Sequence, residues 1–316
     1  METVARTVLV TGGSGLVGRA LKEHIQSTNA VGNFIFASSS DADLREYGET
    51  VKLFNKYKPT HVIHLAVRLM AGSEMHKSMA ELLVANLAID GNVLRCAHEF
   101  KVLKVVSTLS SFAYPQHAQI PITENQLHDG RVHPLYESYG LSKRTLEALS
   151  RAYRSQFNDN FVTIVPTNIF GTVDVQRTDG PVMDALISKA SRAAHSGDQF
   201  VCRGSGAPLR QFCFAPDLAK VLLWALENYD DAEPLNVTGE EISIREVAYA
   251  VARQFGVEDR VRFDSSFPDG PLRRTLSDAK LRSLYPQYSP TDFNTALEIV
   301  CREHRLLEEV QQPSCA

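Results

Sequence analysis

The chain has 316 residues, of which 44% are hydrophobic and 22% are charged, and its formal net charge is −4 at pH 7. These proportions are typical of an ordinary soluble protein with a sizeable core, and they exclude a general attraction to nucleic acid or to anionic membranes. Residues 1–6 carry no apolar leader, and no later run reaches the roughly 18 apolar residues that a membrane span needs. We therefore expect a cytoplasmic protein.

The cysteines are odd in number and widely spaced, which favours reduced structural thiols over a disulfide framework. Their spacing, alone or with histidines, is not that of a metal site, so the sequence predicts no metal. The five cysteines are Cys96, Cys202, Cys213, Cys301 and Cys315.

The first informative stretch is an apolar run at 7–11, followed at once by a glycine-rich segment. The β-forming residues predict a strand, and the glycines predict a tight turn that leads into a helix. Such a turn lets the backbone approach a pyrophosphate, whose charge the new helix terminus attracts. A glycine-rich turn without a ligand is the alternative. The candidate cofactor-binding residues here are Gly12, Ser14, Gly15, Leu16, Val17, Gly18 and Arg19.

The end of the second expected strand, at 33–37, bears on the choice between NAD and NADP. An acidic residue there binds the adenosine ribose, whereas small or basic residues leave room for a 2′-phosphate. The strand is followed by Ser38, Ser39 and Ser40, with no acid before Asp41. Arg19 could supply the positive charge, unless it is simply a solvated helix residue. The sequence therefore favours NADP(H).

Farther along, expected helices at 47–57 and 80–100 alternate with expected strands at 61–66 and 102–106. This alternation predicts an α/β fold, a Rossmann-type doubly wound parallel sheet with a smaller C-terminal substrate-binding domain. His64 lies in the middle of a strand and is expected to be a hydrogen-bonded core histidine.

The most informative constellation combines Tyr139, Lys143 and Ser110. Positions i and i+4 share one face of a helix, so Tyr139 and Lys143 can point at the same ligand. A nearby ammonium favours the phenolate and is expected to bring the pKa of Tyr139 down towards the physiological range. Ser110, at a strand end, can bind the same oxygen. Together with the glycine-rich turn, these residues predict a carbonyl reduction site rather than a chance pair.

With these motifs in view, the chain resembles the GDP-L-fucose synthase family of extended short-chain dehydrogenase/reductases over nearly its whole length. Members of that family epimerise GDP-4-keto-6-deoxymannose at C3 and C5 and then reduce C4 with NADPH. The segments that carry the resemblance are 8–18, 39–44, 59–66, 166–171 and 204–212.

The resemblance assigns roles to individual residues. It implies that Ser110, Tyr139 and Lys143 form the reductase triad. It also places Asp43 and Leu44 at the adenine, Leu65 and Ala66 beside the nicotinamide, and 166–169 at the carboxamide and the substrate. The full set of cofactor residues beyond the glycine-rich turn is Ser39, Ser40, Asp43, Leu44, Leu65, Ala66, Lys143, Pro166, Asn168 and Ile169.

For the substrate, the resemblance implies basic residues against the diphosphate and an aspartate contact. Arginine suits a diphosphate because its planar fork makes paired charge-assisted hydrogen bonds. Ordinary surface charges are the alternative, and the sequence does not settle whether Arg273 or Arg274 faces the ligand. The candidate substrate residues are Ser111, Asn168, Lys189, Arg203, Arg210, Asp269 and Arg274.

The sequence departs from the family where epimerisation takes place. Phe112 occupies the position of the family's catalytic cysteine, and Pro181 that of its histidine partner. Neither side chain can exchange a proton. Arg203 replaces a tryptophan, and 67–74 replaces a glycine-rich segment of the sugar site. We hypothesise that the reductase half survives without the epimerase half, or that the substrate differs.

The expected boundaries are 1–165 with about 214–237 for the NADP-binding domain, and about 166–213 with 238–316 for the nucleotide-sugar-binding domain. The resemblance implies a homodimer packed through the helices at 80–100 and 139–157. Three functions remain open at this point. They are an NADPH-dependent GDP-keto-sugar 4-reductase, a complete GDP-L-fucose synthase with displaced epimerase groups, and a regulatory protein that binds NADP and nucleotide without turnover.

Overall fold

The structure is a computed structural model, and it describes residues 6–69, 78–172 and 181–311. The chain forms two compact units. The first comprises Met1–Thr167, Ala215–Val237 and Ser277–Tyr288, and the second comprises Asn168–Phe214, Thr238–Leu276 and Ser289–Ala316.

A six-stranded sheet with the order β2-β1-β3-β4-β5-β9 forms the centre of the first unit, and all its strand pairs are parallel. Its inner strands are almost wholly buried, as expected of a parallel sheet covered on both faces. The predicted Rossmann-type sheet is therefore confirmed. The strands are β1 (Thr7–Thr11), β2 (Asn33–Ala37), β3 (His61–His64), β4 (Lys104–Thr108), β5 (Phe161–Pro166) and β9 (Leu235–Val237).

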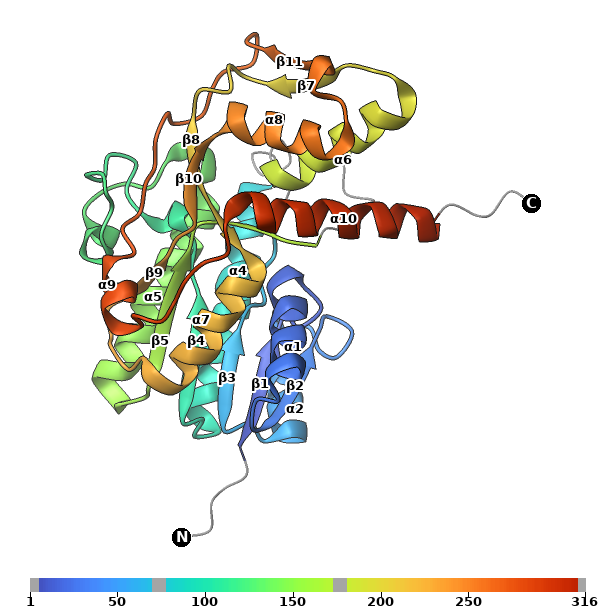
Figure 1. Cartoon of the computed structure of the whole chain (residues 1–316). Helices are drawn as coiled ribbons and strands as arrows, with labels where there is room; N and C mark the ends of the chain where they lie inside the picture. Colours follow the sequence, from blue (N-terminus) through green and yellow to red (C-terminus); the bar gives the residue numbers. More distant parts are fainter. Residues whose placement is uncertain (1–5, 70–77, 173–180, 312–316) are drawn as a thin grey trace. The chain divides into compact units, whose positions relative to one another are not determined.

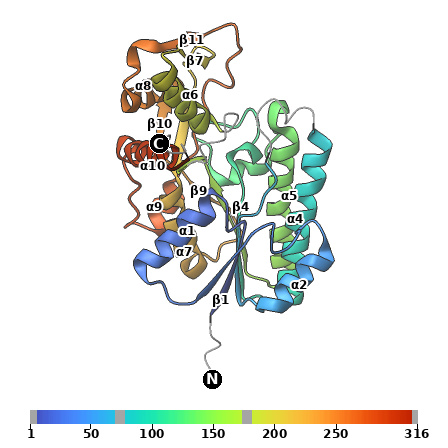
Figure 2. The ribbon, with the colours of Figure 1, turned by 90° about the vertical axis from the view of Figure 1, so that its right-hand side faces the viewer.

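Helices cover both faces of this sheet (Figure 1). Figure 2 shows α1 and α7 on one face and α2, α4 and α5 on the other. The main helices of the unit are α1 (Leu16–Thr28), α2 (Tyr47–Tyr57), α4 (Met79–Glu99), α5 (Glu137–Phe157), α7 (Ala215–Asn228) and α9 (Ala279–Leu284). Short 3₁₀ turns are η1 (Ser111–Ala113), η2 (Glu124–His128) and η3 (Pro134–Tyr136).

Strand β4 lies two residues later in the chain than the sequence indicated. Ser107 and Thr108 pair with Thr163 and Ile164 of β5, so these hydroxyl residues belong to the strand. Leu109 N donates to Ile164 O, which extends the hydrogen bonding between β4 and β5 by one more residue. Ser110 is therefore the first residue that turns away from the sheet.

The second unit is built on two small sheets, β10-β8-β6 and β11-β7. Its apolar core includes a cluster of four aromatic rings, Phe170, Phe212, Phe214 and Phe293, whose neighbouring centroids lie 5.5 to 6.2 Å apart. The strands are β6 (Asn168–Phe170), β7 (Phe200–Arg203), β8 (Leu209–Phe214), β10 (Glu240–Ser243) and β11 (Val261–Asp264). The helices are α6 (Val182–Ser196), α8 (Ile244–Phe255), η4 (Glu258–Arg260) and α10 (Phe293–Gln311).

One domain boundary expected from the sequence differs from the structure. Ser277–Tyr288 was assigned to the smaller domain by sequence, but it packs with the first unit. Ser277 N donates to Ile122 O, and Asn236 Nδ2 of β9 donates to Ser277 O. These backbone partners are far away in the chain, so the sequence pattern gave no sign of them.

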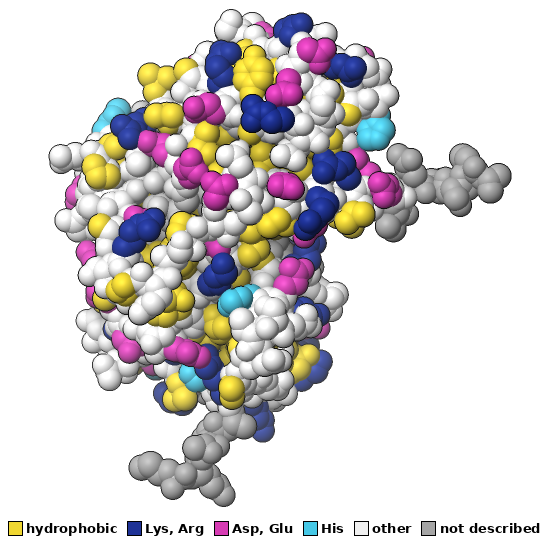
Figure 3. Space-filling view, viewed as in Figure 1, with side chains coloured by type: hydrophobic (Ala, Val, Ile, Leu, Met, Phe, Trp, Pro, Cys, Tyr) yellow, Lys and Arg dark blue, Asp and Glu magenta, His cyan; other side chains and the backbone are white. Residues whose placement is uncertain are grey.

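Among the described helices, none combines the length and the apolar character needed to cross a bilayer. On the face drawn in Figure 3, basic and acidic side chains are interspersed.

Candidate active site

The centre of the candidate site is a pair of hydroxyl groups on two different elements. Ser110 begins η1, where its Oγ accepts a hydrogen bond from Phe112 N at 3.3 Å. Tyr139 lies in the first turn of α5 and is buried, and the Ser110 hydroxyl acts on it by lowering the pKa of its phenol. The fold thus brings together the two hydroxyl residues predicted from sequence.

Close packing of α5 against η1 fixes this pair. Gly140 follows Tyr139, and a Cβ added there would lie 2.5 Å from Phe112 O. A side chain at this position would therefore push the backbone of η1 away from α5. We conclude that a residue without a side chain is needed beside Tyr139.

The pKa of Tyr139 differs from the lowered value that the sequence led us to expect. Burial, with a smaller contribution from the negative charge of Asp90, raises the pKa of Tyr139 to about 12, although the hydrogen bond from Ser110 acts in the opposite direction. The expected lowering by Lys143 is therefore wrong for this structure. A phenol with this pKa keeps its proton throughout the neutral range and can act as a proton donor.

Lys143 lies one helical turn beyond Tyr139 on α5 and is only 2% exposed. Its Nζ lies 4.0 Å from Oδ1 of Asp90, which projects from the neighbouring helix α4. An ammonium this deeply buried needs a counter-charge, and Asp90 provides it.

The glycine-rich turn packs against the end of β3. Gly12 has a φ of +69°, and a Cβ there would lie 2.8 Å from Ala66 N and 2.9 Å from the Leu65 carbonyl carbon. A Cβ on Gly18 would lie 2.5 Å from Gly13 O. The glycine-rich turn is thus held at Gly12 against the backbone of Leu65 and Ala66, after the end of β3.

Helix α1 begins with the features of an anion site. Its N-cap is Gly15, which makes no side-chain capping bond, and its first turn holds no acidic residue. The N–H groups of such a first turn have no partner within the helix, and they carry the positive end of its dipole. These residues fit the pyrophosphate of a dinucleotide.

In the turn after β2, Asp41 is hydrogen-bonded to Ser38. Its Oδ2 accepts hydrogen bonds from Ser38 N at 2.8 Å and from Ser38 Oγ at 2.9 Å. Ser39 and Ser40 are exposed beside it.

Arg45, which the sequence analysis missed, pairs with Asp43 at 2.5 Å and lowers the pKa of that carboxyl to about 2. Arg45 was missed because its pairing depends on the turn after β2.

The remaining cofactor candidates divide between the units. Pro166 ends β5 in the first unit. Asn168 and Ile169 belong to β6 in the second unit, where Asn168 Nδ2 donates to Gln211 O at 2.8 Å. Leu44 is half-buried after β2, and Ser111 is buried in η1.

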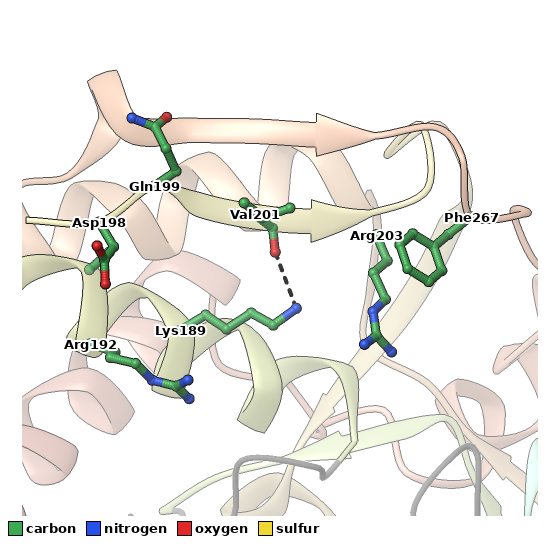
Figure 4. A pocket seen from close by; sticks show the side chains of 8 residues that line it. Lys189, Arg192, Asp198, Gln199, Val201, Arg203 and Phe267 are labelled. Carbon is green, nitrogen blue, oxygen red and sulfur yellow. Dashed lines mark hydrogen bonds between the residues drawn. The ribbon is translucent and has the colours of Figure 1, made fainter. Parts of the chain in front are cut away.

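Two of the substrate candidates, Lys189 and Arg203, line one pocket of about 380 Å³ in the second unit. Arg192 and Phe267 also line it, and sequence reasoning did not find them. Figure 4 shows the guanidinium of Arg203 beside the ring of Phe267, which lies 4.8 Å away, and Lys189 Nζ donating to Val201 O at 3.1 Å. Three basic side chains and one acidic residue, Asp198, give this pocket a net positive charge.

Other substrate candidates are not among the residues lining that pocket. Asp269 accepts hydrogen bonds from Ser205 N at 2.9 Å and from Ser205 Oγ at 2.6 Å. Arg210 NH1 donates to Leu209 O and to Pro271 O. Arg273 pairs with Glu241, while Arg274 is half-buried.

The structure places Phe112 and Pro181, the two positions at which the resemblance implies an acid/base cysteine and histidine, in η1 and before α6. Phe112 stacks on Tyr136, and Pro181 is the exposed N-cap residue of α6. Residues Asp179 and Gly180, and most of the 67–74 segment, lie outside the described residues.

Known proteins resemble this chain in sequence. A model of the NAD dependent epimerase/dehydratase family matches residues 8–239. The chain belongs to this family. A GDP-L-fucose synthase from Dictyostelium discoideum is 40% identical over 305 residues, which cover 95% of each chain. A probable GDP-L-fucose synthase from Drosophila melanogaster is 39% identical, over 92% of this chain and 95% of its own.

Solved structures extend the likeness to the fold. A GDP-L-fucose synthetase from Naegleria fowleri, crystallised bound to NADP, superposes with a TM-score of 0.90 at 33% identity, covering 99% of this chain and 97% of its own. Members of the GDP-L-fucose synthase group of the family are therefore relatives over nearly the whole chain.

Proposed function

We propose that the chain is an NADPH-dependent reductase of the C4 ketone of a GDP-4-keto-6-deoxyhexose, in which the epimerase half of the family reaction is lost. The observation that carries this proposal is the close packing of η1, capped by Ser110, against the first turn of α5, where Tyr139 is buried. The relatives named as GDP-L-fucose synthases support the substrate class, and the NADP-bound structure from Naegleria fowleri supports the cofactor.

Different residues of the first unit donate the proton, orient the carbonyl oxygen and bind the cofactor. When bound, NADPH supplies a hydride to the carbonyl carbon. Tyr139 holds a proton at its Oη, because its pKa is about 12, and donates it to the oxygen that becomes negative. Ser110 hydrogen-bonds the same oxygen and fixes its direction. Gly12, Gly15 and Gly18 let the backbone and the start of α1 hold the pyrophosphate.

The second unit would hold the nucleotide. Lys189, Arg192 and Arg203 suit a diphosphate, because charge-assisted bonds from lysine and arginine to phosphate are strong and directional. Phe267 supplies an apolar surface in the same pocket. Arg210, Asp269 and Arg274 remain candidates for the sugar or the diphosphate.

We propose the loss of epimerisation because of the side chains at two positions. Phe112 and Pro181 carry no exchangeable proton where the family resemblance implies a cysteine and a histidine. A complete synthase would need substitutes for both. His133 is no evident substitute, because its Nδ1 accepts a hydrogen bond from Leu135 N at 3.1 Å.

One assay separates the alternatives. Purified protein is incubated in D₂O with GDP-4-keto-6-deoxymannose and NADPH, and the product is analysed by NMR. NADPH oxidation without deuterium at C3 or C5 is the expected result. Deuterium at those carbons would identify a complete synthase, and tight NADPH binding without oxidation would identify a binding protein.

We also propose a homodimer that forms through α4 and α5. These helices pack together and carry exposed apolar residues, Val84 and Leu87 on α4 and Leu141 on α5. The expected mass in light scattering is twice that of the chain, and Leu87→Asp should return a monomer. A monomeric wild-type protein would contradict this assembly.

A further inference from the structure

A chain of buried polar groups runs through the first unit from β1 to α5. Thr11 Oγ1 lies 2.7 Å from His64 Nδ1, and His64 Nε2 lies 2.9 Å from Asp90 Oδ1. The same oxygen of Asp90 lies 4.0 Å from Lys143 Nζ. None of the four side chains is more than 3% exposed. The reduction mechanism described above assigns no step to any of these four side chains.

The hydrogen bonds link these side chains in series. Ala66 N donates to Thr11 Oγ1 at 3.3 Å, and the Thr11 hydroxyl is hydrogen-bonded to His64 Nδ1. With Asp90 as a carboxylate, His64 Nε2 is the donor in the hydrogen bond between these two side chains. Asp90 can accept this bond as a carboxylate, and its negative charge is directed at Lys143.

Asp90 is unusual for a residue with a purely structural role. Its Oδ2 is buried and has no hydrogen-bond partner among the described residues. A buried carboxylate of this kind is costly, and an unpaired polar atom in a core calls for an explanation. The ammonium of Lys143 lies 4.0 Å from Oδ1, so it compensates the charge of the carboxylate without giving Oδ2 a hydrogen-bond partner.

We propose that Asp90, oriented by His64, is a positioning residue that keeps the Lys143 ammonium charged and fixed in place one helical turn from Tyr139. This inference rests on the proposed function of Tyr139 as the proton donor. Asp90 acts on Tyr139 as well, because its negative charge disfavours the phenolate. The groups that face this cluster are His64 from β3, Asp90 from α4 and Lys143 from α5, with the Ser110 hydroxyl beside Tyr139.

The test is the pH profile of Asp90→Asn, which keeps the shape and removes the charge. The negative charge of Asp90 raises the pKa of Tyr139, so without the carboxylate Tyr139 loses its proton at lower pH. This effect moves the alkaline limb of kcat for NADPH oxidation to lower pH. We expect a shift of about one pH unit towards neutrality, with kcat lowered about tenfold.

A matched control is Asp217→Asn on α7. Asp217 is also a carboxylate with 1% exposure, and it pairs with Lys220 at 2.8 Å, but it lies outside the polar chain. Its replacement is expected to lower thermal stability and to leave the alkaline limb unchanged. The positioning role is overturned if the alkaline limb of the kcat pH profile is unchanged in folded Asp90→Asn. It is also overturned if that limb shifts equally in Asp90→Asn and Asp217→Asn.

A double-mutant cycle covers the case in which Asp90→Asn is poorly folded. Lys143→Met combined with Asp90→Asn removes both charges, so no uncompensated charge remains in the core. If Asp90 acts through Lys143, its replacement costs about tenfold alone and less than about twofold in the Lys143→Met background. Equal costs in both backgrounds would contradict the proposal.

A readout without substrate separates this inference from the proposed function. Proteins labelled with ¹³C at the tyrosine ring carbon that bears the hydroxyl are titrated by NMR, and Tyr139→Phe assigns the signal. Asp90→Asn is expected to lower the titration midpoint of Tyr139. If that midpoint falls while wild-type protein reduces no keto-sugar, the proposed function fails and the link between Asp90 and Tyr139 stands. An unchanged midpoint overturns the link itself.

Discussion

The ring of Phe112 stacks on that of Tyr136, with centroids 4.1 Å apart and an interplanar angle of 27°. It also meets Tyr139 edge-on at 6.3 Å. An aromatic cluster beside the proton donor therefore occupies the position at which the family resemblance implies an acid/base cysteine.

Phe112→Cys alone should not create epimerase activity, because Pro181 still occupies the place of the partner group. We expect the variant to oxidise NADPH with GDP-4-keto-6-deoxymannose and to give a product without deuterium at C3 or C5 in D₂O. Mass spectrometry of the product checks this result. A mass increase would mean that another residue of the chain supplies the second proton transfer.

Tyr139→Phe should abolish most turnover, since it removes the only proton that the proposed mechanism transfers from the protein. We expect kcat to fall by about 10² to 10⁴-fold, and Ser110→Ala to cost less because it leaves the donor in place. Fluorescence titration with NADPH serves as the control, and both variants should bind it within about threefold of wild type. Unimpaired turnover in Tyr139→Phe would overturn its assigned role.

Gly140→Ala should disturb both stability and catalysis. Its Cβ would meet Phe112 O at 2.5 Å, and forcing α5 away from η1 should cost about 1 to 3 kcal/mol of the free energy of unfolding. The same movement separates Ser110 from Tyr139, so kcat should fall as well. Gly48→Ala in α2 is the control, because a Cβ there meets no atom within 4 Å. Equal stability of the two variants in thermal unfolding would contradict the packing described.

Arg203→Leu should weaken the binding of GDP. Loss of one charge-assisted contact to a diphosphate corresponds to about 1.5 to 3 kcal/mol, or roughly a 10- to 150-fold weaker affinity in calorimetry. Arg253→Leu is the control, because Arg253 pairs with Glu258 on the same unit and is not among the pocket-lining residues. If both variants bind GDP like wild type, the nucleotide lies elsewhere.

Glu124→Gln should change how stability depends on pH. Burial raises the pKa of Glu124, whose Oε1 accepts a hydrogen bond from Asn236 N at 3.0 Å. A carboxyl with a raised pKa in the folded state favours folding below its unfolded pKa, and this contribution is lost as the pH rises through the folded value. Glutamine keeps the acceptor without the charge. The variant should therefore melt at a higher temperature than wild type at pH 7, and the difference should shrink towards pH 4. A difference that grows on acidification would contradict the sign.

Much of the first unit followed from the sequence, because strand and helix periodicity and the glycine spacing are local signals. The sequence also predicted that Ser110 and Tyr139 act on the same ligand oxygen, and this stays a prediction. His64 is a hydrogen-bonded core histidine, as predicted. The pKa of Tyr139 was misjudged because Asp90 and the burial of the phenol depend on tertiary packing.

The second unit was harder to predict from sequence. Arg192 lies on α6 and Phe267 after β11, and only the folded chain brings them into the pocket with Arg203. The segment at 277–288 joins the first unit through backbone hydrogen bonds, through the ion pairs of Lys280 with Asp231 and Glu233, and through the stacking of Tyr285 on Trp224. In both cases the deciding partners are distant in the chain.

The most direct test of the account is to follow the hydride. Wild-type protein is incubated with GDP-4-keto-6-deoxymannose and NADPH that carries deuterium at both positions of nicotinamide C4, and the sugar product is examined by NMR. We predict one deuterium at C4 of the sugar for each NADPH oxidised, and none with Tyr139→Phe. NADPH oxidation that leaves C4 of the sugar unlabelled, or binding of both ligands without any transfer, would contradict the account.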